Sequence, residues 1–346
     1  METEVITITD VSEADKIKKA ANVLKNGGLV AFPTETVYGL GADATDSDAA
    51  KKIYAAKGRP SDNPLIIHIS DPEDAERYAY TNECYYSLAK AFMPGPLTVI
   101  LPKKDTVPSS VTGGLDSVAV RCPAHPIANA IIRESGVAIA APSANISGSP
   151  SPTCAEHVVN DMTGRIDMIV DGGVSEIGLE STIIKLDGSK AILLRPGAVT
   201  CDALSCVCES VEISHAVTEE ISANEKPLSP GMKYRHYAPK AQLILLDGTT
   251  DSWIKAIKDS QCEGLAIIAY NELLPDLKRA IPNAFYYSFG DECDENLHAN
   301  LLFEILRDAD KKDFKLIYAP LPKKSGISLA LYNRMIRAAA HKIIRL

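Results

Sequence analysis

The chain has 346 residues, of which 46% are hydrophobic and 23% charged, and its formal net charge is −9. These proportions are typical of a soluble globular protein, and at about 100 to 200 residues per domain the length predicts two domains. No apolar run approaches the ~20 residues that span a bilayer, so we expect no membrane segment. The acidic N-terminus lacks a secretory signal and the eight cysteines form no CxxC pair, so we expect reduced thiols, no zinc finger and a cytoplasmic protein.

Residues 1–205 combine short apolar runs with segments of helical period. Asp46 and Ser47 can cap a helix that Gly58 and Pro60 must end. Further helical segments are expected at 72–79, 83–92 and 125–135, and strands at 29–32, 65–69, 97–101, 118–121, 137–141, 168–170, 182–186 and 191–195. The predicted strands outnumber the helices that could serve as crossover connections between parallel strands, so we predict a mixed, twisted α/β sheet.

Between about residues 212 and 240 the sequence shows no regular hydrophobic periodicity; it is polar and contains proline and glycine. Beyond it, strands and helices are expected in strict alternation, at 242–246, 251–260, 264–269, 271–279, 284–288, 294–309, 314–318 and 327–342. Such alternation predicts a small, doubly wound domain with a parallel sheet. We therefore predict a catalytic domain at 1–205, a linker at 206–238 and a Rossmann-like α/β domain at 239–346.

Polar and cationic residues cluster where the predicted strands and helices of the N-terminal domain end. They are Thr34, Thr36, Lys57, Arg59, Asn63, Arg121, Ser143, Ser181 and Arg195. Ligands of α/β proteins bind at strand ends, and lysine and arginine together suit a phosphorylated ligand. The sequence has no GxxxxGK[ST] loop, no candidate Ser-His-Asp triad and no paired carboxylates, so we expect catalysis by positioning and charge stabilisation.

Each of these features also has a purely structural interpretation. The threonines at 34 and 36 can form a hydroxyl-rich turn, and Lys57 can simply cap the end of its helix. His68, inside a predicted strand, is more often a core or edge histidine than a site residue. In the last predicted helix and the residues after it, four basic residues lie near one face, which is either a solvated surface or a contact for tRNA. They are Arg334, Arg337, His341 and Arg345.

Five N-terminal motifs resemble the signature set of the YrdC-like threonylcarbamoyl-AMP synthases. They are Pro33-Thr-Glu-Thr-Val-Tyr-Gly-Leu-Gly41, Lys57-Gly-Arg-Pro60 with Asn63-Pro-Leu65, Ser143-Ala-Asn145, Glu180-Ser-Thr182 and Arg195-Pro-Gly197. The segment Ser229-Pro-Gly-Met-Lys-Tyr-Arg-His-Tyr-Ala-Pro239 and the sequence from Leu329 onward resemble the longer, two-domain branch of that family. The resemblance covers nearly the whole chain.

The resemblance implies a nucleotidyltransferase that joins L-threonine, bicarbonate or CO2, and ATP into L-threonylcarbamoyladenylate and releases pyrophosphate. It implies a twisted sheet around a concave cationic cavity, Mg2+ accompanying ATP with no side-chain ligand assigned, and a product used to modify an adenosine beside the tRNA anticodon. Product transfer to the tRNA threonylcarbamoyltransferase machinery, and a weak contact with tRNA, follow as expectations.

By motif, the resemblance also assigns residues to substrates. Lys57 and Arg59 are the catalytic candidates, with Lys57 stabilising developing charge. The ATP set is Arg59, Asn63, Ser117, Ser143, Ser151, Arg195, Tyr234, Arg235 and His236. The set for threonine or its carbamate is Thr34, Thr36, His68, Arg121, Ala141 and Ser181. The last three ATP residues belong to the linker, which we expect to close over the nucleotide and exclude water.

Two other functions compete with this interpretation. A nucleic-acid-binding module could use a concave cationic face for double-stranded RNA or tRNA without chemistry, although phosphate contacts need mainly cations and leave Asn63 and Ser143 unexplained. A carbamoyl-adenylate enzyme of the hydrogenase-maturation type shares a related domain. That type also carries zinc fingers, for which the cysteine spacing here gives no sign.

Overall fold

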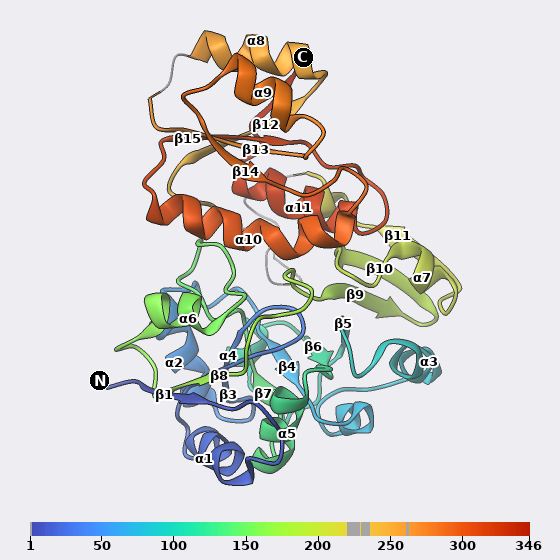
Figure 1. The fold of residues 1–346 in the computed structure, drawn as a ribbon. Helices are drawn as coiled ribbons and strands as arrows, with labels where there is room; N and C mark the ends of the chain where they lie inside the picture. The colour runs from blue at the N-terminus through green and yellow to red at the C-terminus, as the bar shows by residue number, and fades with distance from the viewer. Residues whose placement is uncertain (1, 220–228, 230–235, 261–262) are drawn as a thin grey trace. The chain divides into compact units, whose positions relative to one another are not determined.

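The computed structural model describes residues 2–219, 229, 236–260 and 263–346, and Figure 1 shows their fold as a ribbon. The chain divides into two compact units, residues 1–147 with 151–233, and residues 148–150 with 234–346. Each unit has its own β-sheet and its own hydrophobic core. None of the helices in the described part of the chain is long and apolar enough to cross a lipid bilayer.

The first unit is built on a mixed sheet of eleven described strands in the order β1-β8-β2-β3-β7-β4-β6-β5-β9-β10-β11. The strands are β1 (Glu4–Thr7), β2 (Val30–Phe32), β3 (Gly39–Asp43), β4 (Ile66–His68), β5 (Leu97–Pro102), β6 (Ser117–Arg121), β7 (Ile139–Ala140), β8 (Met168–Asp171), β9 (Thr182–Asp187), β10 (Lys190–Arg195) and β11 (Ser210–Ile213). Strands β4 and β6 pair in parallel, whereas β5 and β6 are antiparallel. The predicted mixed α/β sheet is therefore confirmed.

Short helices connect these strands. They are α1 (Ala14–Lys25), α2 (Ser47–Lys57), α3 (Glu83–Phe92), α4 (Ser109–Thr112), α5 (Pro126–Ser135), α6 (Ala155–Met162) and α7 (Cys201–Ser205), with 3-10 turns η1 (Pro72–Arg77) and η2 (His215–Val217). Helix α2 has the predicted limits, because the Asp46 side chain accepts a hydrogen bond from Asp48 N at 2.8 Å and Gly58 ends the helix at φ 63°. This helix end places Lys57 in its last turn.

One hydrophobic core cluster of the first unit lies between helices α1 and α5 and strands β2, β7 and β8. Leu24 of α1, Ile131 of α5, and Phe32 and Val170 of the strands are all fully buried there. Burial of apolar side chains contributes about 25 cal/mol per Å2 of area removed from water, so this cluster is a major stabilising element. The rigid sheet fixes the strand ends that carry the candidate site.

The second unit is a smaller domain with a wholly parallel sheet, as predicted. Its five described strands have the order β14-β13-β15-β12-β16. The elements are β12 (Gln242–Asp247), α8 (Thr250–Ser260), β13 (Leu265–Ala269), α9 (Leu274–Ala280), β14 (Phe285–Ser288), α10 (Glu295–Lys311), β15 (Leu316–Pro320), α11 (Ser328–Ala338) and β16 (Ile343–Arg345). Trp253 and Ile257 of α8 pack with Ile267 and Leu277 in its core.

Two strands of the first unit differ from the sequence-based expectation. Residues 39–43, for which no strand was predicted, form β3, which pairs with β2 and β7. Gly41 is required there, because a Cβ atom would lie 2.6 Å from Phe32 and 2.7 Å from Ile139. Residues 210–213, expected to be linker, form β11 and pair in parallel with β10. Much of the predicted linker before residue 219 thus belongs to the first unit.

The expected basic face of the last helix is not formed. Helix α11 ends at Ala338 instead of continuing to 342, and Ala340 and His341 have positive φ values of 46° and 58°. Arg334 is fully buried, and its guanidinium lies 5.8 Å from the centre of the Tyr237 ring. Arg345 belongs to β16. The four residues therefore do not line one helix face, since Arg334 is a core residue of the second unit.

Candidate active site

Five neighbouring strands of the first unit bring the candidate residues into one row. The pairing register links His68 of β4 to Arg121 of β6, and Arg121 to Thr98 of β5. It continues from Thr98 to Ile183 of β9 and from Ile183 to Arg195 of β10. Register partners point to the same face of a sheet, so His68, Arg121 and Thr98 share one face. Arg195 stands at a register shift between β9 and β10, but its Nη2 and Thr98 Oγ1 both contact Ser181 Oγ, so its side chain lies on the same side as Thr98. This arginine row therefore places two cations and a histidine on one side of the sheet.

The polar members of the arginine row are withdrawn from solvent. His68, Thr98, Arg121 and Arg195 are each no more than 6% exposed. Buried guanidinium groups are costly unless they are paired or hydrogen-bonded. Their partners therefore determine what the row can bind.

Ser181 is the hydrogen-bonding centre at one end of the arginine row. Arg195 Nε donates to the Ser181 carbonyl oxygen at 3.0 Å, and Arg195 Nη2 donates to Ser181 Oγ at 3.1 Å. Thr98 Oγ1 lies 2.7 Å from the same Ser181 Oγ. These contacts fix the plane of the Arg195 guanidinium, which is the geometry that a planar fork needs to bind a phosphate or carboxylate.

Arg121, next to His68 in the row, is held by a buried carboxylate. Arg121 Nη2 donates to Glu35 Oε1 at 2.7 Å, and the two side chains are 5% and 7% exposed. Burial alone would raise the pKa of Glu35, but the Arg121 charge and hydrogen bond outweigh it and hold that pKa below its ordinary value. Glu35 Oε2 is buried and has no hydrogen-bond partner among the described residues.

His68 is neutral in this environment. Burial, reinforced by the neighbouring Arg121 charge, lowers the pKa of His68 to about 3. Its Nδ1 lies 3.2 Å from the Ile66 carbonyl oxygen, and its ring meets Phe32 edge to face with the centres 6.4 Å apart. The histidine is therefore both a member of the arginine row and a packed core residue.

The loop at residues 33–38 lies beside the other candidate segments. Thr34 Oγ1 is 2.8 Å from Thr36 Oγ1 and donates to the Val37 carbonyl oxygen at 2.6 Å. The Ala144 N–H donates to the Tyr38 carbonyl oxygen, and the Gly178 N–H donates to that of Thr36. Both threonines are buried and form the hydroxyl-rich turn that was the structural alternative. Through these two backbone hydrogen bonds, the turn is nevertheless joined to both the segment at residues 143–145 and the segment at residues 178–181, which carry other candidate residues.

Lys57 holds a second part of the site. Its buried ammonium donates to the carbonyl oxygen of Ser143 and, at 2.6 Å, to that of Asn145. The Asn145 side-chain oxygen lies 3.4 Å away, and Ser143 Oγ donates to it at 2.5 Å. Lys57 is thus more than a helix cap, because it ties the end of α2 to the turn at residues 143–145.

Arg59 organises a third segment. Its Nε and Nη2 donate to the carbonyl oxygens of Asn63 and Pro64 at 3.3 and 3.1 Å. Asn63 Oδ1 is buried without a hydrogen-bond partner among the described residues, so it is able to accept a hydrogen bond from a substrate. Ser117 lies at the start of β6, where it pairs in register with Pro102 of β5. It stands on the same strand as Arg121, four residues before it.

The remaining predicted residues occupy separate positions. The Ala141 N–H donates to the Ile66 carbonyl oxygen at 2.8 Å, so Ala141 lies beside β4. Ser151 Oγ donates to Glu180 Oε1. His236 belongs to the second unit, where its ring lies 5.5 Å from that of Tyr237. The predictions for Tyr234 and Arg235 fall outside the described residues, and the closing linker stays a prediction.

Sequence reasoning missed several partners that position the candidate residues. Glu35 and Glu180 stood inside quoted motifs without a role, although both are buried and hydrogen-bonded to predicted site residues. Thr98 lies in the middle of an apolar strand, where only the strand order reveals it. Asn145 was also quoted but unassigned. A polar residue in an otherwise fully apolar strand was the one signal available for Thr98.

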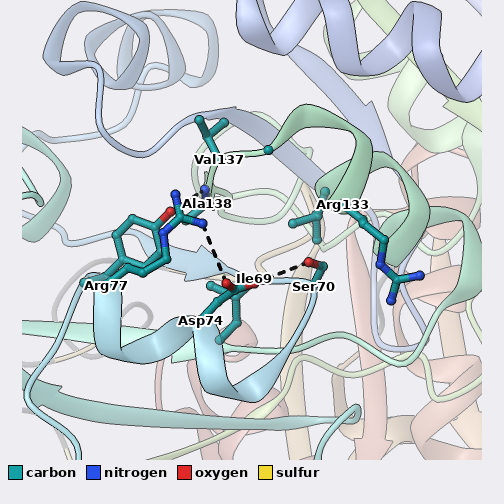
Figure 2. A pocket seen from close by; sticks show the side chains of 10 residues that line it. Ile69, Ser70, Asp74, Arg77, Arg133, Val137 and Ala138 are labelled. Atoms are coloured by element: carbon teal, nitrogen blue, oxygen red, sulfur yellow. Dashed lines mark hydrogen bonds and ion pairs between the residues drawn. The ribbon is translucent and has the colours of Figure 1, made fainter.

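Two other groups in the first unit do not involve the predicted site residues. A cavity of about 120 Å3 is lined by Ser70, Asp74, Arg77 and Arg133 among others, and Figure 2 shows Arg77 turned toward Asp74, with which it forms an ion pair at 3.6 Å.

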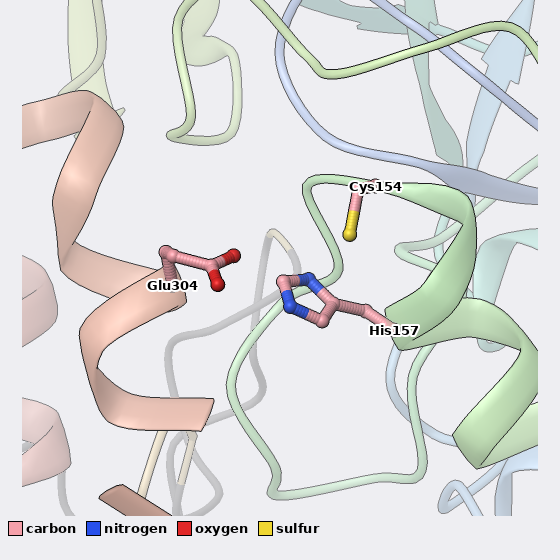
Figure 3. A group of neighbouring side chains, drawn as sticks. All are labelled: Cys154, His157 and Glu304. Carbon is pink, nitrogen blue, oxygen red and sulfur yellow. The ribbon is translucent and has the colours of Figure 1, made fainter. Parts of the chain in front are cut away.

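Figure 3 shows the second group, Cys154 and His157 at the start of α6. The Thr153 N–H donates to His157 Nδ1 at 3.3 Å, and His157 is buried. That contact gives His157 a local structural role.

Comparison with known proteins places this geometry in a family. The family model described as "Telomere recombination" matches residues 22–197, and the model described as "Threonylcarbamoyl-AMP synthase, C-terminal domain" matches residues 199–340. Threonylcarbamoyl-AMP synthase of Bacillus subtilis is 45% identical over 333 residues, covering 95% of this chain and 94% of the relative. The chain belongs to the threonylcarbamoyl-AMP synthase family.

Other members of the family agree over the full length. The Pyrococcus abyssi threonylcarbamoyl-AMP synthase is 44% identical and covers 99% of both chains. The crystal structure of P. abyssi Sua5 complexed with L-threonine matches with a TM-score of 0.90 and 42% identity, over 99% of this chain and all of that one. The family, the two-part α/β fold and the nucleotidyl-transferring enzyme class predicted from the sequence are therefore confirmed.

Proposed function

We propose that this protein condenses L-threonine, bicarbonate or CO2, and ATP into L-threonylcarbamoyladenylate, with release of pyrophosphate. The observation that carries the proposal is the arginine row, in which Arg121 and Arg195 are held at fixed positions on one sheet face by Glu35 and Ser181. Two fixed forks suit a reaction between a carboxylate-bearing amino acid and a polyphosphate. The similarity to P. abyssi Sua5, whose structure contains L-threonine, supports the amino-acid substrate.

The proposed chemistry has two steps. The threonine amine adds to CO2 and loses a proton, which gives a carbamate. A carbamate oxygen then attacks the α-phosphorus of ATP in line, the bond from that phosphorus to the bridging oxygen breaks, and pyrophosphate leaves. In-line transfer of this kind needs positioning and charge stabilisation more than covalent help from the protein. The absence of any nucleophilic triad in the sequence agrees with this requirement.

The residues divide between the substrates according to their positions. Of the five N–H groups of a guanidinium, Arg121 uses Nε for the Gly95 carbonyl oxygen and one Nη2 hydrogen for Glu35. Its Nη1 donors fit the threonine carboxylate, with Thr34, Thr36, His68, Ala141 and Ser181 around the same substrate. The ATP set is Arg59, Asn63, Ser117, Ser143, Ser151 and Arg195, with the orphaned Asn63 Oδ1 as an acceptor.

Lys57 acts beside the phosphates in this proposal. Its ammonium is anchored by the turn at residues 143–145, so it carries a fixed positive charge next to Ser143. A fixed charge stabilises a developing negative charge without the reorganisation that water requires. Lys57 is therefore assigned to stabilise the charge that develops on the phosphate oxygens.

Magnesium enters as the companion of ATP. The described residues near the cations do not form a magnesium cage, because Glu35 is paired with Arg121 and Glu180 accepts from Ser151. Mg2+ commonly keeps its waters and binds through substrate phosphates instead of an all-protein cage. We accordingly propose Mg·ATP as the substrate and assign no side chain to the ion.

Burial of the arginines distinguishes this enzyme from an RNA-binding module. Arg121 and Arg195 are 4% and 6% exposed, and the phosphate backbone of a duplex cannot reach guanidinium groups at that depth. A small substrate can reach these guanidinium groups. We propose that tRNA enters later, when a transferase moves the threonylcarbamoyl group from the released or transferred product to an adenosine beside the anticodon.

Product analysis tests the proposal. The purified chain is incubated with Mg·ATP, L-threonine and labelled bicarbonate, and the nucleotides are separated and identified by mass spectrometry. Labelled threonylcarbamoyl-AMP is expected from the wild type and from Arg133→Lys, an exposed arginine outside the row. Arg195→Lys, which loses the fork that binds Ser181, is expected to form at least tenfold less. Nucleotide products that never carry the label would refute the proposal.

A further inference from the structure

Two thiols that are 124 positions apart in the sequence face one another outside the candidate active site. Cys84 Sγ lies 4.0 Å from Cys208 Sγ. Cys84 is in the first turn of α3, and Cys208 lies between α7 and β11. Both belong to the first unit, so one compact body fixes their separation.

The turn between β9 and β10 holds both thiols in place. On one side, Asn82 Nδ2 donates to the Gly188 carbonyl oxygen at 3.0 Å, and Cys84 Sγ lies 3.8 Å from that of Ser189. On the other side, the Glu209 N–H donates to the same Ser189 carbonyl oxygen at 3.1 Å, and Ser189 Oγ donates to the Glu209 carboxylate at 2.6 Å. Ser189 therefore joins the segments that carry the two cysteines.

The two thiols differ in exposure, so one of them can react with an oxidant before the other. Cys84 is partly exposed, whereas Cys208 is buried. Burial, with the nearby Cys84 adding to it, raises the pKa of Cys208 to about 12. The thiolate is the reactive form, so an oxidant from solution meets Cys84 first and Cys208 can react only with a partner already beside it.

We propose that Cys84 and Cys208 form a reversible disulfide when the chain meets a low-molecular-weight disulfide such as glutathione disulfide. The Cys84 thiolate attacks one sulfur of the oxidant and expels a glutathione thiolate, which leaves a mixed disulfide. Cys208 then loses its proton, attacks the Cys84 sulfur and expels the second glutathione. Two protein thiols are oxidised by two electrons in total, one glutathione disulfide is reduced, and the two protons end on the two glutathione thiols.

The geometry permits this bond after a small movement. A disulfide has its sulfur atoms about 2 Å apart, so the present separation must shrink by roughly 2 Å. Rotation of the partly exposed Cys84 side chain about its Cα–Cβ bond can supply that change. The bond would join α3 to the segment before β11 and close a long loop, which stabilises the first unit by restricting its unfolded state.

Peptide mapping after defined oxidation tests the proposal. The full chain is equilibrated with buffers of increasing glutathione disulfide to glutathione ratio, free thiols are alkylated, and the protein is digested without reduction. The expected result is a peptide pair linked between Cys84 and Cys208, an intact mass lower by about 2 Da when measured before alkylation, and reversal by dithiothreitol. A melting temperature several degrees higher than that of the reduced chain is expected as well.

Three variants make the test specific. Cys84→Ser and Cys208→Ala must abolish both the linked peptide and the rise in melting temperature; the alanine avoids burying an unpaired hydroxyl at position 208. Cys206→Ser, an exposed cysteine two positions away, must leave both unchanged. Persistent glutathione adducts at Cys84 without a link to Cys208 would overturn the proposal, and so would a link from Cys84 to Cys206.

Discussion

The buried ion pair between Glu35 and Arg121 gives the most discriminating mutational test of the site. Glu35→Gln keeps the shape and one hydrogen-bond acceptor but removes the negative charge that lies 2.7 Å from Arg121. Arg121 would then remain a buried cation, held by the Gly95 carbonyl oxygen and a neutral amide. Both the stability of the first unit and the orientation of the proposed threonine-binding fork depend on this contact.

The size of the effect follows from burial. Removing one partner of a buried pair costs about 3 to 5 kcal/mol, because the other charge stays desolvated and uncompensated. Since glutamine retains a hydrogen bond, we expect the lower end, about 3 kcal/mol of unfolding free energy. The pKa of Glu35 is held below its ordinary value of 4.5, so its contribution is present above pH 4.5 and is lost as the pH falls through the lowered pKa. The difference between wild type and variant must therefore shrink in acid.

A double-mutant cycle measures the interaction itself. Urea denaturation at pH 7 is compared for wild type, Glu35→Gln, Arg121→Met and the double variant, and the KM for L-threonine is measured where activity allows. A coupling of at least 1 kcal/mol is expected, with the double variant more stable than the sum of the single effects. We also expect Glu35→Gln to raise the KM for threonine about tenfold or more. Additivity within about 0.5 kcal/mol, together with an unchanged KM, would refute the reasoning.

Three further substitutions probe the rest of the site. Thr98→Val removes the hydroxyl that lies 2.7 Å from Ser181 Oγ, so the free energy of unfolding should fall by about 1 to 3 kcal/mol. Thr98→Ser keeps a hydroxyl and should lose less stability. Equal KM values for L-threonine in the two variants would argue against a positioning role of Thr98. Lys57→Met should lower kcat by about 100- to 1000-fold, and a loss under threefold would remove Lys57 from the mechanism. Burial lowers the pKa of His68 from 6.5 to about 3, so the free energy of unfolding of the wild type should fall by about 1.4 kcal/mol per pH unit below pH 6.5. His68→Asn should reduce this dependence of stability on pH. Equal slopes of unfolding free energy against pH in the two proteins would contradict the prediction.

Local sequence signals predicted the elements that carry the site. The Asp46 cap and Gly58 define α2, and thereby place Lys57, through contacts within a few residues. Apolar runs with clear punctuation likewise identified β4, β6 and β10, whose ends carry His68, Arg121 and Arg195. Such signals act over short distances, so a single sequence is enough to interpret them.

The features of the site that could not be predicted from the sequence depend on contacts between residues far apart in the chain. The arginine row depends on the order β4-β6-β5-β9-β10, which local periodicity does not specify. Glu35 was given no role because its partner Arg121 is 86 positions away in the sequence. Strand β11 was missed because it lies at the edge of the sheet with mostly exposed side chains, so it has no buried stripe to reveal it.

The proposed reaction requires a single chain to couple threonine, bicarbonate and ATP. The direct measurement is the rate of pyrophosphate release from Mg·ATP with L-threonine and bicarbonate each omitted in turn, in buffers freed of CO2. The proposed reaction predicts release only when all three substrates are present, in amounts equal to the threonylcarbamoyl-AMP formed. Pyrophosphate released at the same rate without threonine would contradict the account.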